Sequence, residues 1–111
     1  MAKVTKLMNE SLFEATLTES GVDAVVCLHP KNLFYTTAYP MAMSHAIHQR
    51  PSGPRSGIVV FTAGDKPTLI VGGNEAKVTR DTTWVEDIRV YSEYVDSPMV
   101  ILAEVLQEKG L

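Results

Sequence analysis

Residues 57–71 read Gly-Ile-Val-Val-Phe-Thr-Ala-Gly-Asp-Lys-Pro-Thr-Leu-Ile-Val, and this stretch decides the fold. Its two ends, 57–62 and 68–71, are rich in the β-branched and aromatic side chains that strands favour. The Ala-Gly-Asp-Lys-Pro segment between them is typical of a turn. The stretch therefore predicts an antiparallel β-hairpin in the middle of the chain.

Downstream of the hairpin, the chain predicts a helix, a strand and a second helix. Gly72-Gly73 leads into a short helix near 74–81, and residues 84–91 carry the apolar pattern of a strand. Ser97-Pro98 begins the last helix, because serine caps helices and proline fits the first helical position. Its predicted buried stripe consists of Met99, Leu102, Val105 and Leu106, and Gly110 ends it.

Upstream, residues 4–20 predict an amphipathic helix that ends at Gly21. The stripe that we expect to be buried contains Val4, Leu7, Met8, Leu12 and Ala15, widened by Phe13 and Leu17. Residues 23–28 follow as a strand, and because residues 24–28 are continuously apolar, we expect an internal position in an α/β sheet. Residues 30–39 predict a turn and a short helix, with Asn32 as a candidate cap.

Residues 41–55 have no clear period and contain two prolines and a glycine, so we expect mostly loop, with a short strand at 43–47 as an alternative. The whole order is helix, strand, helix, long loop, hairpin, helix, strand, helix. This order predicts one α/β domain over residues 1–111, with three α/β/α layers around a mixed sheet of four to five strands.

Composition narrows the function classes. The chain has 111 residues, 45% hydrophobic residues and a net charge of −3, which gives no broad attraction to nucleic acid or to an anionic membrane. No apolar run approaches the roughly 20 residues that span a bilayer. The single cysteine, Cys27, rules out an intrachain disulfide. We therefore expect a cytoplasmic protein with neither nucleic-acid nor membrane partners.

Several short motifs, in one order, resemble the N-terminal domain of the creatinase/prolidase family. They are Gly-Val-Asp-Ala-Val-Val at 21–26, Pro-Lys-Asn-Leu-Phe-Tyr-Thr-Thr-Ala-Tyr at 30–39, the hairpin with Arg55 before it, Glu75-Ala76, and Trp-Val-Glu-Asp-Ile-Arg-Val-Tyr at 84–91. The resemblance implies a ribonuclease H-like α/β motif. It covers nearly the whole chain.

The resemblance also implies a function. In this family the N-terminal domain is non-catalytic, and a larger "pita-bread" domain performs the hydrolysis. We expect that catalytic C-terminal domain to lie beyond residue 111. The parent protein would be an Xaa-Pro aminopeptidase or dipeptidase, or a creatinase-like hydrolase, with two divalent ions (manganese, cobalt or zinc) in the catalytic domain. The resemblance implies a homodimer, and no cofactor, metal ligand or catalytic residue within this chain.

Four residues of the 41–55 loop are the candidate site: His45, His48, Arg50 and Arg55. In oligomeric relatives the N-terminal domain of one subunit lies beside the active site of another. The resemblance therefore implies that these loop residues contact the substrate of the other subunit, in trans. The guanidinium group of arginine can donate two parallel hydrogen bonds to a substrate carboxylate. A metal site at the two histidines would need a third ligand, which the pattern does not supply. The alternative is a free-standing module that binds a small carboxylate ligand through this loop.

Three other features of the sequence do not indicate a binding or catalytic site. Gly72-Gly73 lacks the lysine and hydroxyl of a phosphate loop, so a tight turn is the better interpretation. Tyr35, Tyr39 and Trp84 are interpreted as packing or interface aromatics. Ala38 stands where the family usually has glycine, and since glycine alone takes a positive φ without steric cost, alanine predicts a different turn there.

Overall fold

The described helices and strands follow one another along the chain in the order that the sequence predicts. The computed structural model describes residues 6–28, 30–38, 57–92 and 97–111. Its elements are α1 (Glu10–Ser20), β1 (Val25–Cys27), α2 (Pro30–Thr37), β2 (Gly57–Phe61), β3 (Thr68–Gly72), the 3₁₀ turn η2 (Gly73–Glu75), α4 (Ala76–Thr82), β4 (Asp87–Tyr91) and α5 (Pro98–Glu108).

The described strands form one mixed sheet in the order β1-β2-β3-β4. Strand β2 is antiparallel to both of its neighbours, and Ile58 lies opposite Ile70 in the predicted hairpin. Strand β4 is parallel to β3, with Leu69 opposite Ile88. Because parallel strands need a crossover, η2 and α4 carry the chain from the end of β3 to the start of β4.

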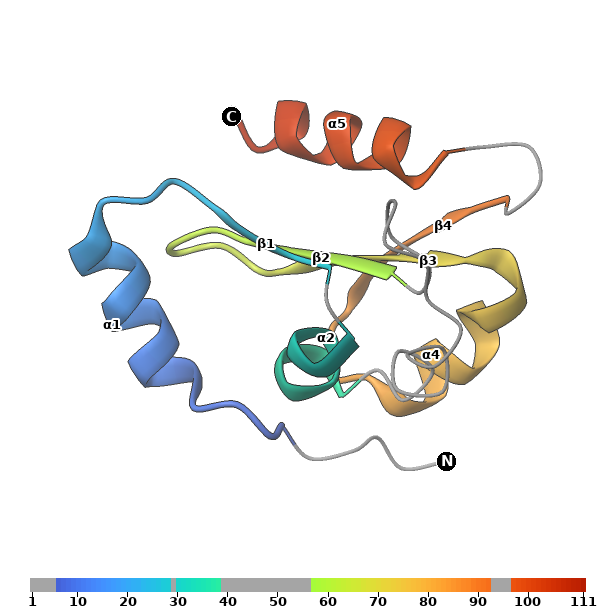
Figure 1. Ribbon diagram of the computed structural model, residues 1–111, viewed down its shortest axis with the longest axis horizontal. Helices are drawn as coiled ribbons and strands as arrows, with labels where there is room; N and C mark the ends of the chain where they lie inside the picture. The colour runs from blue at the N-terminus through green and yellow to red at the C-terminus, as the bar shows by residue number, and fades with distance from the viewer. Residues whose placement is uncertain (1–5, 29, 39–56, 93–96) are drawn as a thin grey trace.

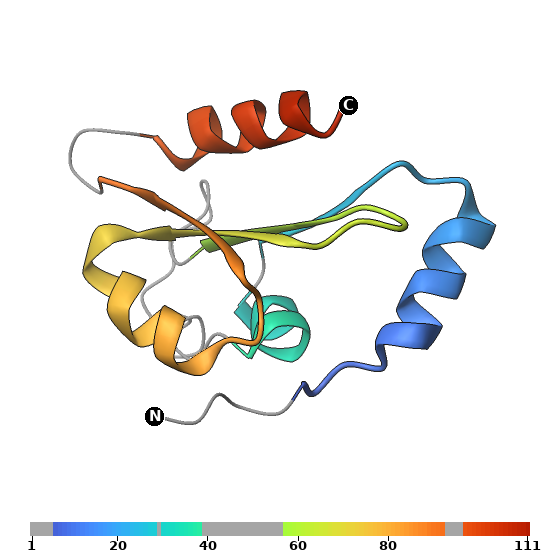
Figure 2. The same cartoon turned by 180° about the vertical axis from the view of Figure 1, so that it is seen from behind.

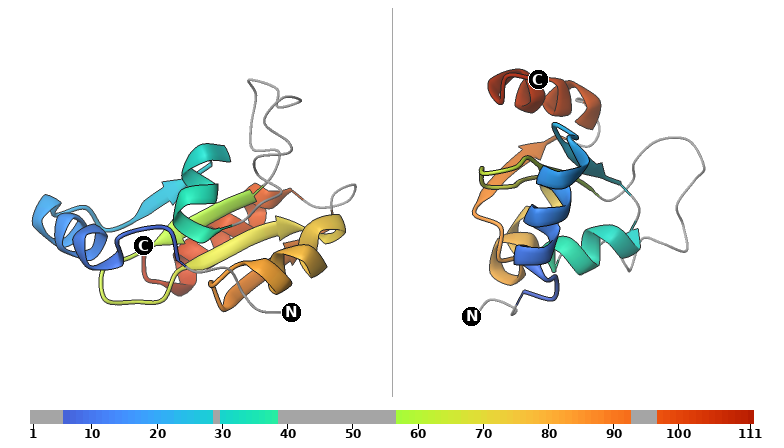
Figure 3. Two further views of the ribbon diagram at one scale, coloured as in Figure 1. Left: turned by 90° about the horizontal axis from the view of Figure 1, so that it is seen from below. Right: turned by 90° about the vertical axis from the view of Figure 1, so that its left-hand side faces the viewer.

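Helices cover both faces of the sheet (Figures 1 and 2). Helix α5 lies on one face, and α2 and α4 lie on the other. Helix α1 stands at one end of the molecule, beside the β2–β3 turn (Figure 3). The prediction of a three-layer α/β domain with a mixed sheet of four to five strands is confirmed, and the described residues form four strands.

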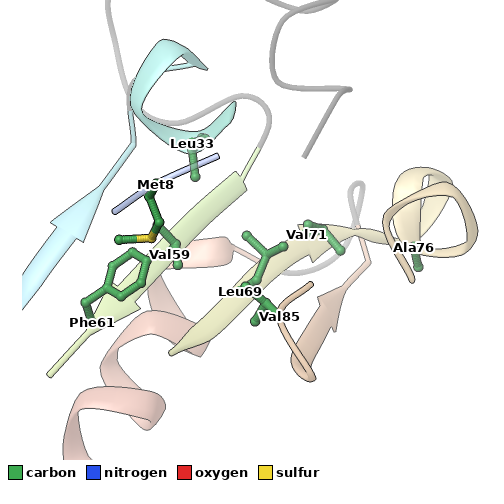
Figure 4. Packing of buried hydrophobic residues seen from close by; sticks show 8 residues of the cluster. All are labelled: Met8, Leu33, Val59, Phe61, Leu69, Val71, Ala76 and Val85. Carbon is green, nitrogen blue, oxygen red and sulfur yellow. The ribbon is translucent and has the colours of Figure 1, made fainter. Parts of the chain in front are cut away.

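Two apolar clusters hold the layers together, one on each face of the sheet. Figure 4 shows the cluster under α2 and α4, which consists of Met8, Leu33, Val59, Phe61, Leu69, Val71, Ala76 and Val85. The cluster under α5 contains Ile58, Val60, Ile70, Tyr91 and Val105. Neighbouring residues of β2 and β3 alternate between the two clusters, as the two-residue period of a strand requires. Both central strands are therefore buried on both faces.

The N-terminal helix begins later than predicted. Asn9 caps it, because the Asn9 Oδ1 accepts a hydrogen bond from the Leu12 amide at 3.0 Å, and the described residues before Asn9 are not helical. The buried face is therefore that of Phe13 and Leu17, whereas Leu7 and Leu12 are largely exposed. Met8 of the predicted stripe is buried together with Phe13 and Leu17, so that part of the prediction is confirmed. The prediction was wrong for Leu7 and Leu12, because it assumed a helix extending back to residue 4. Gly21 does end the helix with a φ of 71°, as predicted.

Three smaller predictions need correction. Strand β1 lies at an edge of the described sheet rather than inside it, although both of its faces carry packed side chains. Asn32 lies within α2, which begins at Pro30, so it is not the cap. Met99 is 42% exposed, while Val105 of the same predicted stripe is buried. The predicted strand at 43–47 falls outside the described residues.

Ala38 ends α2 in the left-handed conformation, so the prediction of a different turn was wrong. Its φ is 58° and its side chain is buried. The amide of Ala38 still donates to the Phe34 carbonyl at 2.9 Å, which closes the last turn of the helix. Alanine thus takes the backbone conformation that glycine takes without steric cost.

Candidate functional site

The four residues that the sequence singled out lie outside the described part of the chain. His45, His48, Arg50 and Arg55 all belong to the segment 39–56. Their contact with a substrate in trans therefore stays a prediction.

The described residues contain no cluster suited to a metal ion. Across 6–28, 30–38, 57–92 and 97–111, no three His, Cys, Asp or Glu side chains lie together in a way that could hold one. Within those same ranges, no helix is both long and apolar enough to cross a membrane. Cys27 is half-buried, and burial raises the pKa of its thiol, which disfavours the reactive thiolate.

A hollow of about 260 Å³ combines an aromatic side chain with charged side chains of both signs. It lies between the start of α1, the β2–β3 turn and the segment that leads into β4. The Lys6 ammonium lies 4.4 Å from the centre of the Trp84 ring. The same ammonium pairs with the Glu10 carboxylate at 2.5 Å. The remaining lining residues are Asp65, Lys66, Pro67 and Glu86. We call this feature the Trp84 hollow.

Hydrogen bonds to the end of α2 fix the orientation of the Trp84 ring. Its indole Nε1 donates to the Thr36 carbonyl at 3.0 Å. The adjacent Thr83 hydroxyl donates to the Thr37 carbonyl and accepts from the Val85 amide at 3.2 Å. These bonds satisfy carbonyls at the end of α2 that have no partner within the helix. They also tie the entry of β4 to α2, which holds the indole in one orientation.

A second, more apolar groove runs between α1 and α2. It is lined by Met8, Asn9, Leu12, Phe13, Thr16 and Tyr35, and its volume is about 220 Å³. Leu12 and Tyr35 are 62% and 50% exposed. The Tyr35 hydroxyl accepts a hydrogen bond from the Asn9 amide at 3.3 Å, so the cap of α1 is held against α2. The groove offers apolar contact and few charges.

A third cluster joins α5 to the sheet. The Arg89 guanidinium bonds Glu108 of α5 at 2.7 and 3.2 Å, and Asp87 of its own strand at 2.9 and 3.3 Å. Beside it, the Lys109 ammonium bonds Asp65 and the Lys66 carbonyl, both at 3.1 Å. We call this set the Arg89 network.

The Arg89 network shifts the pKa values of its carboxyls. Hydrogen bonds from Arg89 hold the pKa of Glu108 below its usual range. The same guanidinium is the main cause of the lowered pKa of Asp87, to which the Thr68 hydroxyl also contributes. Lys109 lowers the pKa of Asp65 by its hydrogen bond and charge. All three carboxylates are used to hold α5 and the β2–β3 turn in place.

Sequence reasoning did not find the Trp84 hollow or the Arg89 network. It interpreted Trp84 as a packing or interface aromatic and assigned no role to Lys6. Lys6 precedes α1, so its spacing of four residues from Glu10 does not by itself bring the two side chains together. Arg89 and Glu108 are 19 residues apart, and no local pattern brings them together.

The fold and these surfaces define a small α/β domain whose described polar clusters bind its own elements to one another. Comparison with known proteins then assigns the domain. The model of the creatinase/prolidase N-terminal domain family matches residues 11–111, and the chain belongs to that family.

Solved structures share the fold. An Xaa-Pro aminopeptidase from Streptococcus pyogenes is similar, with a TM-score of 0.66 and 20% identity over 94% of this chain and 68% of that one. The aminopeptidase P of Streptococcus thermophilus has a TM-score of 0.66 and 16% identity, over 92% of this chain and 66% of that one. A search of curated proteins found no match.

Proposed function

We propose that this chain is the non-catalytic N-terminal domain of a hydrolase related to the Xaa-Pro aminopeptidases. The observation that carries the proposal is the family match over residues 11–111. The domain supports oligomerisation and controls access to an active site that belongs to a separate catalytic domain. The hydrolase acts on an amide or other C–N bond of a small substrate.

The names of the similar structures support the reaction class. Both are Xaa-Pro aminopeptidases, and both share the fold at a TM-score of 0.66. In our proposal, the parent protein holds two divalent ions of manganese, cobalt or zinc in its catalytic domain. It is a cytoplasmic homodimer, and its partners include neither nucleic acid nor membrane.

The loop 41–55 supplies the contact with substrate in this proposal. Arg50 and Arg55 would bind a substrate carboxylate in trans, because a guanidinium offers two parallel donors to a carboxylate. His45 and His48 would restrict access beside them. Each of these roles requires the catalytic domain of the partner subunit.

The test is to express the entire reading frame that contains this chain and to assay it with Xaa-Pro dipeptides and longer peptides. We expect hydrolysis that depends on manganese, cobalt or zinc. Substituting Arg50→Ala and Arg55→Ala should raise KM more than it lowers kcat, whereas Lys77→Ala on the exposed surface of α4 should change neither.

A reading frame that stops after Leu111 would contradict the proposal. In that case the free-standing carboxylate-binding module is the better account. Titration of the 15N-labelled chain with acetate, succinate and an amino acid would then show saturable shifts. Wild-type kinetics in the double arginine variant would contradict only the role of the loop.

A further inference from the structure

The Trp84 hollow already contains a bound cation, namely the side chain of its own Lys6. The ammonium lies over the ring face at 4.4 Å from the centroid, where the negative face of the indole attracts a positive charge. The Glu10 carboxylate lies 2.5 Å from the same nitrogen. The hollow thus provides an aromatic face and an anion, the two elements that recognise an organic cation.

The lining of the hollow favours a positive charge even without Lys6. Apart from Lys6 it contains three carboxylates, those of Glu10, Asp65 and Glu86, against one further cation, Lys66. Lys66 lies 3.5 Å from Glu86, and both side chains are mostly exposed. Asp65 is paired with Lys109 at 3.1 Å. Removing Lys6 would therefore leave the Glu10 carboxylate beside the Trp84 ring as the excess negative charge of the hollow.

The position of Lys6 makes it replaceable. Lys6 precedes the Asn9 cap and lies outside α1, so its side chain can leave without breaking the helix. The side chains of Lys6 and Glu10 are 42% and 50% exposed, and exposed ion pairs are weak. The Trp84 ring itself is held by its bond to the Thr36 carbonyl and needs no reordering to accept another cation.

We propose that the Trp84 hollow is a binding site for an alkylammonium or guanidinium group, and that Lys6 occupies it as an intramolecular competitor. The ligand is an organic monocation with a short apolar stem. The stem packs on the indole beside Pro67, and the charged head lies between Glu10 and Glu86. The proposal does not depend on the proposed hydrolase role.

Trp84 is the only tryptophan of the chain, so one indole signal in a ¹H–¹⁵N spectrum reports on this site alone. The probes are n-butylammonium, the amides of N-acetyl-lysine and N-acetyl-arginine, and the neutral 1-butanol, each at constant ionic strength. The variants are Lys6→Ala, Lys6→Ala with Glu10→Gln, and the control Lys77→Ala, which removes a lysine from a similar i,i+4 pair on α4.

We expect n-butylammonium to shift the indole signal of Lys6→Ala saturably. Binding to the wild type and to Lys77→Ala should be roughly three- to fivefold weaker, the size of one exposed cation–π contact. Adding Glu10→Gln to Lys6→Ala should weaken it again, and 1-butanol should give no saturable shift. Tighter binding of the acetylated amides than of n-butylammonium would identify a peptide side chain as the natural occupant. The reverse would identify a free small cation.

Three results would overturn the proposal: no saturable shift in Lys6→Ala, an equal response to 1-butanol, or equal affinities in Lys6→Ala and the wild type. If the remaining amide signals show that Lys6→Ala disturbs the fold, Lys6→Gln makes the same comparison with a side chain of similar length.

Discussion

Ala38 occupies a backbone conformation that costs alanine roughly 1–2 kcal/mol, yet its methyl group is buried. The hydrogen bonds around it explain how the conformation is kept. Trp84 and Thr83 bond the carbonyls of the two residues before it, and the Ala38 amide closes the helix. These hydrogen bonds therefore hold Ala38 in the left-handed conformation. The residue type alone did not predict this conformation.

Ala38→Gly should change the free energy of unfolding by no more than about 1 kcal/mol. Relief of the left-handed strain is offset by the lost methyl burial, about 0.8 kcal/mol, and by the greater freedom of glycine in the unfolded chain, about 0.4–1 kcal/mol. Ala38→Val should cost more than about 2 kcal/mol, because a β-branched residue is strained there and overpacks the site. Urea unfolding followed by circular dichroism measures both. Equal stability of the two variants would refute the explanation.

Thr83 links two elements through one buried hydroxyl. Replacing it with the isosteric Thr83→Val leaves the Val85 amide without this partner and removes a donor from the Thr37 carbonyl. The expected loss is about 1–3 kcal/mol, the cost of buried polar groups that lose their bonds. Thr83→Ser keeps the hydroxyl and should lose less. A valine variant as stable as the serine variant would show that the hydroxyl contributes nothing.

Among the elements, those with local signals were predicted best. The β2–β3 hairpin, the Ser97-Pro98 start of α5 and the Gly21 end of α1 each depend on residues adjacent in sequence. The start of α1 was missed because apolar residues continue at helical spacing before Asn9, whereas the Asn9 side chain caps the helix and makes it begin there. The position of β1 at an edge was missed because burial on two faces does not fix a strand's neighbours.

The attachment of α5 to the sheet should depend on pH. The lowered carboxyl pKa values of Asp87 and Glu108 mean that the folded protein keeps them charged to lower pH than the unfolded chain does. Their contribution is complete at neutral pH. It is lost progressively as the pH falls below the ordinary values of 4.5 for Glu and 3.8 for Asp, towards the folded values.

Arg89→Gln should therefore lower the urea midpoint at pH 7 and flatten its decline between pH 5 and roughly pH 2, an interval that brackets these titrations. The control Arg80→Gln, on the exposed face of α4, should leave both the midpoint and its pH dependence unchanged. Parallel pH curves for Arg89→Gln and the wild type would contradict a role for this network in acid stability.

For the molecule as a whole, the fold and the family were predictable from the sequence, whereas the described surfaces were not. The family motifs lie in stretches of consecutive residues, so they could be recognised without coordinates. The Trp84 hollow and the Arg89 network each join side chains from three separate stretches of the chain. Such sites depend on the tertiary packing of the sheet, which no local period encodes.

The central claim is that these residues form a scaffold and that catalysis belongs to another stretch of polypeptide. The most direct measurement is hydrolysis of Xaa-Pro peptides by the purified, folded chain of 111 residues, with added manganese, cobalt or zinc. The account predicts no turnover above that of the metal alone. Robust turnover that rises with protein concentration and co-elutes with the pure chain would contradict it.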